Sequence, residues 1–514
     1  MTQNERISLP IWKKIILFLI SLIVFSIQIG LFFLLVDTYL NYNSIKNQVG
    51  IIYILTLVVA LLYVAYIISK PISTNYKLTW SVLILILPIP FCLLYTLNST
   101  SRRMSKRKRL KIFNAVKKLE IKDDMDKLLK EDKTGANLVQ AIKHNSLYPV
   151  YKGSKFTFFN DAELKHNDFV NELQKASSYV LLEYFIIADG QLMDELFSIL
   201  NELGNKGVKI YIIYDDIGSR GRMNKKLVKK LSKIPNCLIT NYEPLGFSFN
   251  LLVNYRDHRK IAVIDGGIAY CGGDNLADEY VHKKERFGFW RDNCGKYEGK
   301  VVASFVYLFL EMWYISTKQK ITLPIPNIEY NEAGYITVFG DEPTNNTDPG
   351  YDLFLAMISS AKKYIYISTP YFIVDDALRK LIALKAKCGV KVVLLMPKIP
   401  DKKSAYYMGR ENYNEILSAG GFIYEFTPGF NHAKNIIVDD SYAFIGTINM
   451  DYRSLFLHYE CGALIINNPE IIKMREDFVD ALTKSQLVTL EAYKKRSKLQ
   501  RLIAFFLNLF APLF

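Results

Sequence analysis

Cysteine and histidine are both scarce in this chain of 514 residues, and the scarcity excludes several classes of protein. The six cysteines are scattered and form no Cys-x-x-Cys pair, which argues against a disulfide framework or a zinc site and fits a reducing compartment. Acidic residues are outnumbered as well: 50 Asp and Glu stand against 65 Lys and Arg, for a formal net charge of +15. This balance favours an anionic partner, either nucleic acid or anionic lipid.

Long apolar runs, in contrast, fill the start of the chain. Half of all residues are hydrophobic although 22% are charged, a mixture that indicates membrane segments attached to a globular body. Residues 15–36, 51–69 and 80–97 are each long enough, or nearly so, to cross a hydrocarbon core of about 30 Å. We therefore predict a transmembrane region over residues 1–100, with buried helices of a soluble domain as the alternative.

A basic segment follows the third apolar run. The sequence SRRMSKRKRLK at residues 101–111 places this end on the cytoplasmic side of a cell membrane. The N-terminus is basic too, and three full crossings cannot leave both ends inside, so either the N-terminus is outside or one segment does not cross. We predict a basic linker with juxtamembrane helices over residues 101–146, which either binds anionic headgroups or only ends the anchor.

From about residue 147, short apolar runs alternate with amphipathic stretches, which is typical of an α/β domain. The order strand, helix with a closing glycine, strand occurs twice, and the expected elements are 179–187, 192–207 and 208–216, then 364–369, 377–389 and 390–397. The duplication predicts two homologous α/β units.

These units should cover residues 147–325 and 326–498. An apolar tail over residues 499–514 follows them and is too short to span a bilayer. The tail either lies on the membrane surface or docks on the protein body.

Two of the six histidines stand in the same short pattern, His-x-Lys-x4-Asp. The stretch DHRKIAVID contains His258, Lys260 and Asp265, and the stretch NHAKNIIVD contains His432, Lys434 and Asp439. In a strand, residues i and i+2 share a face, so each histidine should point the same way as its lysine. Each aspartate lies five residues past its lysine, so its side chain should point to the opposite face near the strand end, where we expect it to fix the loop.

The pair of histidine and lysine is suited to a phosphate. Imidazole attacks phosphorus or exchanges a proton near neutral pH, and an ammonium group offsets the charge of phosphoryl oxygens. One copy supplies a nucleophile without an acid for the leaving group, whereas two facing copies supply both. The duplicated pattern therefore predicts one site built by both halves.

An asparagine lies ten residues past each aspartate, after a glycine turn. Asn275 and Asn449 can donate side-chain hydrogen bonds to phosphate oxygens. Two complete copies of this set in matching strand–helix–strand units argue against a chance origin. For the glycines alone, a tight turn is an equally good interpretation.

With these motifs the sequence resembles the phospholipase D superfamily, whose signature is the repeated His-Lys-Asp motif. Within that superfamily it resembles the bacterial cardiolipin synthases. The resemblance rests on the stretches YRDHRKIAVIDG, GGDNLADEY, FWRD, GFNHAKNIIVDD and GTINMDYRSLFLHYE. It covers almost the whole chain, although the first 50 residues match only in hydrophobicity. It implies two phospholipase D-type α/β units related by a pseudo-twofold axis and preceded by N-terminal transmembrane helices.

The resemblance also implies a phosphatidyl transfer between two phosphatidylglycerol molecules through a phosphohistidine, without a metal or other cofactor. By analogy, His258 is the nucleophile and His432 the acid/base, and the near-symmetry of the two copies leaves the reverse open. Asp292 and Glu460 are implied to orient the two imidazoles, with a surface ion pair as the alternative for either. The implied partners are phosphatidylglycerol and anionic membrane lipid.

Four other functions compete with this interpretation. The same fold could use water as acceptor and hydrolyse phospholipid, or use serine and make phosphatidylserine. A nuclease of the same superfamily would suit the basic charge, but apolar segments at both ends favour a lipid, so no nucleic acid is expected. A non-catalytic membrane scaffold would not explain two complete sets of reactive residues.

Overall fold

The structure is a computed structural model, in which the chain forms two compact units. It describes residues 30, 33, 37, 46–70, 74–101, 123–143, 148–242, 255–343 and 347–511. The first unit comprises Met1–Met104, Leu245–Asn254 and Phe506–Phe514, and the second comprises Ser105–Pro244 and Tyr255–Phe505. Both predicted α/β halves lie in the second unit. The predicted span 15–36 and the basic stretch 101–111 lie almost entirely outside the described residues.

The first unit is helical. Its helices are α2 (Lys46–Ile68), α3 (Thr74–Ile86), α4 (Pro88–Ser101) and the end of α19 (Lys498–Leu509). Among the described residues, the segment Gly50–Ile68 is the one helix long and apolar enough to cross a membrane. The predicted span 80–97 is instead divided at Leu87 between two shorter helices, next to prolines that restrict the backbone. A multi-pass arrangement therefore stays a prediction.

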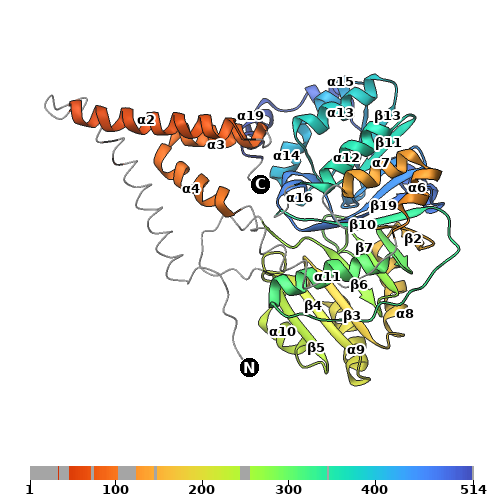
Figure 1. The fold of residues 1–514 in the computed structure, drawn as a ribbon. Helices are drawn as coiled ribbons and strands as arrows, with labels where there is room; N and C mark the ends of the chain where they lie inside the picture. Colours follow the sequence, from red (N-terminus) through yellow and green to blue (C-terminus); the bar gives the residue numbers. More distant parts are fainter. Residues whose placement is uncertain are drawn as a thin grey trace. The chain divides into compact units, whose positions relative to one another are not determined.

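The second unit contains two large mixed sheets (Figure 1). The seven-stranded sheet has, in spatial order, β2 (Lys155–Phe159), β9 (Cys294–Glu298), β7 (Ile268–Gly272), β6 (Lys260–Ile264), β3 (Tyr179–Tyr184), β4 (Lys209–Asp215) and β5 (Cys237–Tyr242). Strands β3, β4 and β5 are parallel, and β6 runs antiparallel between β3 and β7.

The nine-stranded sheet repeats this plan with one extra strand at each edge. Its order is β1 (Val150–Lys152), β10 (Tyr335–Asp341), β19 (Glu460–Ile466), β17 (Tyr442–Gly446), β16 (Asn435–Val438), β11 (Tyr364–Ser368), β13 (Lys391–Pro397), β14 (Phe422–Phe426) and β20 (Ser485–Leu487). Strands β11, β13 and β14 are parallel, and β16 runs antiparallel between β11 and β17. The two sheets therefore share one strand order, from β2 to β5 and from β10 to β14.

The helices of the second unit connect and cover these sheets. They are α6 (Met125–Glu131), α7 (Lys133–Lys143), α8 (Ala162–Leu173), α9 (Gln191–Asn205), α10 (Lys225–Leu231), α11 (Val302–Thr317), α12 (Pro349–Ser360), α13 (Asp376–Lys387), α14 (Lys403–Glu411), α15 (Tyr413–Ser418), α16 (Tyr452–Phe456), α17 (Glu470–Thr483) and α18 (Leu490–Lys494). The described residues of this unit also form four short strands: β8 (Phe289–Arg291), β12 (Phe372–Ile373), β15 (Gly429–Asn431) and β18 (Met450–Asp451).

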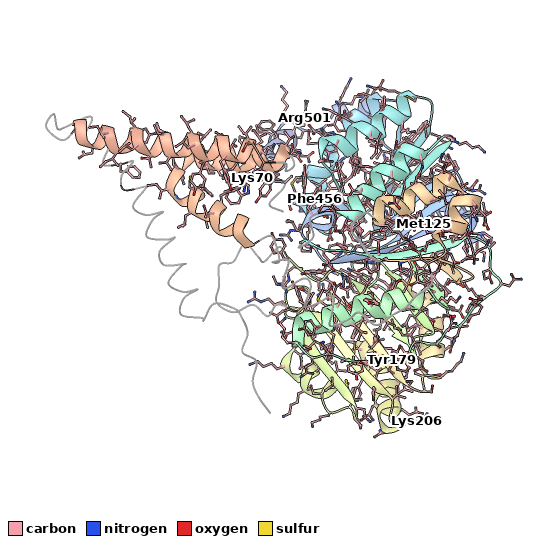
Figure 2. The ribbon with its side chains drawn as sticks, viewed as in Figure 1. Lys70, Met125, Tyr179, Lys206, Phe456 and Arg501 are labelled. Carbon is pink, nitrogen blue, oxygen red and sulfur yellow. The ribbon has the colours of Figure 1, made fainter. Side chains whose placement is uncertain are left out.

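The elements predicted from the duplicated pattern are confirmed. Helices α9 and α13 end just before Gly207 and Gly389, whose φ values of 92° and 86° lie in the left-handed region that glycine adopts without strain. Strands β4 and β13 follow these glycines directly. Figure 2 shows Tyr179 at the start of β3 and Lys206 after the end of α9, where that helix reaches the edge of the unit.

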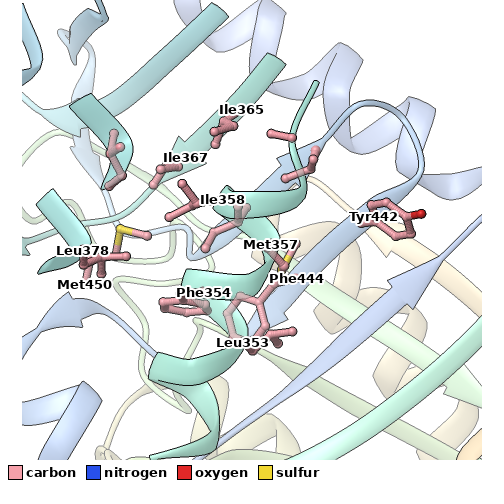
Figure 3. Close-up of a cluster of buried hydrophobic side chains, with 14 of the residues drawn as sticks. Leu353, Phe354, Met357, Ile358, Ile365, Ile367, Leu378, Tyr442, Phe444 and Met450 are labelled. Carbon is pink, nitrogen blue, oxygen red and sulfur yellow. The ribbon is translucent and has the colours of Figure 1, made fainter. Parts of the chain in front are cut away.

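Side chains are buried on both faces of each sheet. Alternate residues of β3 enter different cores: Leu181 joins the core between the sheets, and Leu182 joins the core under α8, α9 and α10. Helix α11, which contains the aromatic run FVYLFLEMW, lies with α17 in the core between the sheets. In the outer core of the second half, Phe354 of α12 packs against Phe444 of β17, with ring centroids 4.9 Å apart (Figure 3).

Candidate active site

Backbone contacts between the two halves bring the two histidines to one place. Strand β15, which leads directly to His432, pairs in parallel with β8 of the first half. The N–H of His432 donates to the carbonyl of Arg291 at 2.7 Å, and the N–H of His258 donates to the carbonyl of Tyr459 at 2.9 Å. Each histidine is thus held by the backbone of the opposite half.

The carboxylates that contact the imidazoles are exchanged in the same way. Nδ1 of His432 lies 2.6 Å from Oδ2 of Asp292, which belongs to the first half. Nδ1 of His258 lies 2.9 and 3.0 Å from the two carboxylate oxygens of Glu460, which belongs to the second half. The hydroxyl of Thr447 donates a hydrogen bond to Oε2 of Glu460. All four members of the two pairs are buried, so the surface ion-pair alternative does not fit this geometry.

Burial and neighbouring cations keep both imidazoles neutral at rest. Burial, followed by the charge of Lys434, lowers the pKa of His432 to about 4, although Asp292 opposes the shift. Burial, followed by the charge of Lys260, lowers the pKa of His258 well below its usual range. A neutral imidazole whose Nδ1–H is held by a carboxylate presents a lone pair at Nε2, as a nucleophile or base requires.

The two lysines of the motif lie beside their histidines and are themselves buried. Nζ of Lys260 donates to the carbonyl oxygen of His258 at 2.6 Å, and Nζ of Lys434 donates to that of His432. Burial lowers the pKa of Lys434 to about 7 and lowers that of Lys260 as well. Two buried ammonium groups without a directly bonded carboxylate among the described residues form a site for an anion such as phosphate.

The surroundings shift the pKa values of the two orienting carboxyl groups in opposite directions. Burial alone would raise the pKa of Asp292, but His432 and Lys434 lower it below its ordinary value, so this group is ionised. Burial raises the pKa of Glu460 well above its ordinary value, although Lys260 opposes the shift. The two otherwise similar pairs are therefore electrostatically unequal.

The motif aspartates lie at the opposite ends of their strands from the histidines. Both occupy the left-handed backbone region, with φ values of 52° for Asp265 and 53° for Asp439. The carboxylate of Asp265 accepts backbone hydrogen bonds of 2.8 Å from Ser177, Ser178 and Tyr179. The carboxylate of Asp439 accepts equivalent bonds of 2.7 to 2.8 Å from Lys362, Lys363 and Tyr364. The structure thus places neither aspartate beside the imidazoles, and both fix the loop before a central strand.

The two asparagines have unequal surroundings. Asn275 uses both ends of its amide inside the protein, because Oδ1 accepts from the N–H of Ile186 at 2.9 Å and Nδ2 donates to Oη of Tyr280 at 2.7 Å. Asn449 is also buried, but its Oδ1 has no hydrogen-bond partner among the described residues. Of the two, Asn449 is therefore the better placed to bind an additional group.

Arg259, between the histidine and lysine of the first motif, is a completely buried support that the sequence pattern did not reveal. Its Nε donates to the carbonyl oxygen of Glu460 at 3.3 Å, and its Nη1 donates to that of Leu308 at 3.1 Å. Its Nη1 also lies 3.9 Å from the carboxylate of Glu183. The guanidinium therefore ties the backbone of the orienting glutamate to α11 and β3.

A third histidine, which is not part of the repeated motif, lies next to the first. The ring centroid of His458 is 5.3 Å from that of His258, and its exposed fraction of 8% matches the 7% of His258. Trp290 holds the same place beside His432, with ring centroids 5.4 Å apart. Both neighbours lie two residues before the orienting carboxylate, and this shared offset is the sequence signal that marks His458.

One group of described residues has the composition of a metal site: His258, His458 and Glu460 present ligand atoms within 4.8 Å of one another. The charge around them opposes a divalent cation, because Lys260 and Lys434 both act on His258. The same charges attract an anion. The donor set therefore suits phosphate better than a metal ion.

Together these groups can carry out a substitution at phosphorus. One neutral imidazole can attack, and the other can deliver a proton to the leaving oxygen. The ammonium groups can neutralise the charge on the remaining phosphoryl oxygens. A bound phosphate anion would also raise the depressed pKa values of these groups, so that one imidazole takes up the proton for the leaving oxygen while the other stays neutral and attacks.

Comparisons with known proteins agree with this chemistry. A family model described as "Cardiolipin synthase, PLD-like domain" matches residues 354–482. Cardiolipin synthase 2 of Bacillus cereus is 36% identical over 349 residues, which cover 67% of this chain and 68% of that protein. Cardiolipin synthase of Geobacillus kaustophilus is 33% identical over 371 residues, which cover 71% of this chain and 74% of that protein.

A solved structure shares the mixed α/β fold. Phosphatidylserine synthase of Haemophilus influenzae superposes with a TM-score of 0.54 over 74% of this chain and 97% of that chain. The two sequences are 15% identical in this superposition, so the likeness concerns the fold alone.

Proposed function

This chain belongs to the cardiolipin synthases of the phospholipase D superfamily, and from that premise we propose how its own residues transfer a phosphatidyl group. The substrate is phosphatidylglycerol in both roles, as donor and as acceptor, and the products are cardiolipin and glycerol. The observation that carries the proposal is the exchanged pairing of two buried histidines with Asp292 and Glu460 around two buried lysines.

In the first step, Nε2 of His258 attacks the phosphorus of the donor. A nitrogen–phosphorus bond forms, the bond from phosphorus to the glycerol oxygen breaks, and His432, which is protonated in the complex with the anionic donor, gives that oxygen the proton from its Nε2. Lys260 and Lys434 neutralise the phosphoryl oxygens as charge builds up on them. Glycerol leaves, and the phosphatidyl group stays on the histidine.

In the second step, His432, now neutral, takes the proton from a hydroxyl of a second phosphatidylglycerol. The acceptor oxygen bonds to phosphorus, the nitrogen–phosphorus bond breaks, and cardiolipin leaves. Asp292 holds the tautomer of His432 and stabilises the charged form that exists before the first step and after the second. No residue is consumed, because both imidazoles return to their starting protonation states.

A pseudo-twofold axis between the two halves would explain the exchange of carboxylates. The common strand order of the two sheets supports it, as does the pairing of β8 with β15. Under such symmetry either imidazole could attack. The assignment of His258 as the nucleophile rests on the family resemblance.

A membrane location fits a lipid substrate. Helix α2 is long and apolar enough to cross a bilayer, and the basic stretch at residues 101–111 would keep the catalytic halves in the cytoplasm. Further crossings by residues 15–36 and 80–97 complete the proposed multi-pass anchor.

The direct test uses purified enzyme in detergent–lipid micelles with phosphatidylglycerol labelled in its headgroup glycerol. We expect equal amounts of cardiolipin and released glycerol, and neither product from His258→Ala or His432→Ala. Phosphatidic acid as the sole lipid product would identify a hydrolase, and incorporation of added serine would identify a phosphatidylserine synthase. Release of nucleotides from added DNA, without any lipid product, would identify a nuclease.

A further inference from the structure

Helix α10 and the turns on either side of it carry charge of a single sign. Residues 217–242 contain seven Lys and Arg residues and no Asp or Glu, although the whole chain holds 50 acidic residues against 65 basic ones. Neither the His-Lys-Asp motifs nor the proposed transfer uses any of these seven cations. A surface of one charge attracts ligands of the opposite charge, so this segment is a candidate binding surface.

The lysines of α10 gather on the outer face of the helix. Two leucines of α10 are buried in the core of the first half, and Figure 1 shows the helix beside β5, the last strand of its sheet. At about 100° per residue, the lysines at the first, second and fifth positions of the helix point away from these leucines. With two exposed neighbours they form a surface that we call the basic face: Arg220, Lys225, Lys226, Lys229 and Lys233.

The charges of the basic face do not serve the fold. None of its five side chains forms an ion pair with an acidic residue in the part of the chain that the structure describes. The neighbouring Lys230 is paired with Asp194 at 2.6 Å, and Asp189, near the start of the helix, offsets at most one of the five charges. Lys225 and Lys226 occupy the first turn of α10, where the helix dipole disfavours positive charge. Helix stability therefore does not account for them.

The basic face begins beside the active site. Arg220 directly follows Ser219, whose hydroxyl donates a hydrogen bond to the carbonyl oxygen of Phe185 at 3.1 Å. The ring centroid of Phe185 lies 4.8 Å from that of His258. From Arg220 the chain continues directly into α10, which starts at Lys225. A flat partner that binds the basic face therefore comes close to the side of the unit that holds the reacting imidazole.

We propose that the basic face binds the anionic surface of a lipid bilayer and holds this side of the catalytic unit against the membrane. The choice of lipid as the partner rests on the proposed function, because both substrates of that reaction are anionic lipids. The composition of the segment supports this choice. Residues 217–236 contain no aromatic residue, whereas surfaces for single-stranded nucleic acid combine cations with aromatic side chains on which bases stack.

Exposed lysines suit a lipid surface because it offers many equivalent phosphates and needs no fixed geometry. Each cation near such a surface strengthens binding roughly fivefold at low salt. The attraction acts over the Debye length, which falls from about 10 Å in 0.1 M salt to about 3 Å in 1 M salt. The basic face should therefore contact anionic membranes in dilute buffer and separate from them in concentrated salt.

The first experiment measures contact without turnover. Full-length protein is placed in nanodiscs of phosphatidylcholine, either pure or mixed with phosphatidic acid, which is anionic but has no headgroup alcohol to release. A neutral reagent acetylates exposed lysines, and mass spectrometry gives the rate for each one. We expect Lys225, Lys226 and Lys229 to react roughly fivefold more slowly in the anionic nanodiscs, and the difference to vanish in 1 M salt. Lys380 and Lys387, exposed on α13, should react equally fast in both.

The second experiment removes the charges and measures cardiolipin formation in mixed micelles. The variant combines four exposed changes in the basic face: Lys225→Gln, Lys226→Gln, Lys229→Gln and Lys233→Gln. We expect the apparent KM for phosphatidylglycerol to rise roughly tenfold or more at low salt, while kcat stays within about twofold, because the changes weaken surface binding and leave the chemistry intact. A control variant removes the same charge from exposed lysines elsewhere and should change neither constant: Lys320→Gln, Lys380→Gln, Lys387→Gln and Lys403→Gln.

Equal acetylation of the basic face in both kinds of nanodisc would overturn the inference. So would a four-lysine variant with an unchanged KM, or one whose kcat alone falls, since that would assign the lysines to the chemistry. Protection of the same lysines by an added oligonucleotide, but not by phosphatidic acid, would assign the face to nucleic acid. If phosphatidic acid protects the lysines and the unaltered protein makes no cardiolipin, the proposed function is wrong and the binding surface stands.

Discussion

Asp292, from the first half of the catalytic unit, holds Nδ1 of His432, from the second half, at 2.6 Å. Glu460 and His258 repeat this relationship in the opposite direction. Neither half therefore contains a complete oriented histidine of its own. The two halves depend on each other for the protonation state of their reactive groups, and a separated half would have a histidine with an undefined tautomer.

Substitution of Asp292 by Asn should nearly abolish the transfer. The amide keeps the shape of the carboxylate but can neither fix the reactive tautomer of His432 nor stabilise its charged form, and comparable changes cost about 10³- to 10⁴-fold in kcat. The measurement is kcat for cardiolipin formation, with thermal unfolding to verify the fold. Asp278→Asn, which changes a carboxylate bonded to the N–H groups of Gln191 and Leu192, is the matched control. Activity of Asp292→Asn within tenfold of normal would contradict an orienting role.

The matched change Glu460→Gln should be milder than Asp292→Asn. Burial raises the pKa of Glu460 and so favours the neutral carboxyl group, which a neutral amide resembles. The pKa of Asp292 is lowered instead, so an amide at that position removes a charge. We expect a loss at least about tenfold smaller than that of Asp292→Asn, measured in the same assay. If Glu460→Gln is as inactive as Asp292→Asn, both carboxyl groups act as anions.

The aspartates of the motif should govern stability and leave the chemistry unchanged. Asp265→Asn removes a charged acceptor from three backbone N–H groups at the start of β3, which should lower the free energy of unfolding by about 1 to 3 kcal/mol. Asp439→Asn should do the same at β11. Thermal unfolding measures the first effect, and kcat of the folded fraction should stay within about twofold. A large loss of kcat at an unchanged unfolding midpoint would assign these residues to the chemistry instead.

The dependence of activity on pH should follow Lys434. Burial lowers the pKa of this group to about 7 in the free protein, so it is charged below that pH and loses its charge as the pH rises. Burial lowers the pKa of His258 well below its usual range, which keeps the attacking imidazole neutral down to mildly acidic conditions. We therefore expect kcat/KM to be highest below about pH 7 and to fall above it, since kcat/KM reports free-enzyme groups.

The comparison variant for this profile is Lys434→Arg, which keeps its charge at every pH tested. The overall activity of this variant should be lower because the guanidinium is larger. Its kcat/KM should not show the fall above about pH 7 that deprotonation of Lys434 causes in the unaltered protein. Identical alkaline limbs in both proteins would assign the step to another group, such as Lys260.

The repeated units of the fold were predictable from the sequence because local periodicity determines them. Apolar strands, amphipathic helices and the glycines after α9 and α13 stand at matching places in both halves. The divided run at Pro88 was harder to predict: hydropathy alone does not register that a proline interrupts a helix.

The exchange of carboxylates was not predictable, because it depends on long-range contacts. Asp292 and Glu460 were expected near the histidines, but the pairing of β8 with β15 and the bridge between Asp257 and Tyr459 decide which imidazole each one reaches. His458 was not predictable for another reason: its counterpart in the first half is Trp290, so this residue is not repeated between the halves. The duplication in the sequence marks only residues that are the same in both halves.

A single charge at the centre of α2 should reveal whether that helix spans the membrane. Val59 is the middle residue of the apolar segment Gly50–Ile68 and is half-exposed. An arginine at the centre of a spanning helix costs about 2.5 to 3.5 kcal/mol, so Val59→Arg should shift protein out of washed membranes. Leu384→Arg places the same residue on the exposed face of α13 and should leave the distribution unchanged. Equal distributions for both variants would mean that α2 packs as a soluble helix, and the lipid substrate would then have to be reached through some other segment of the chain.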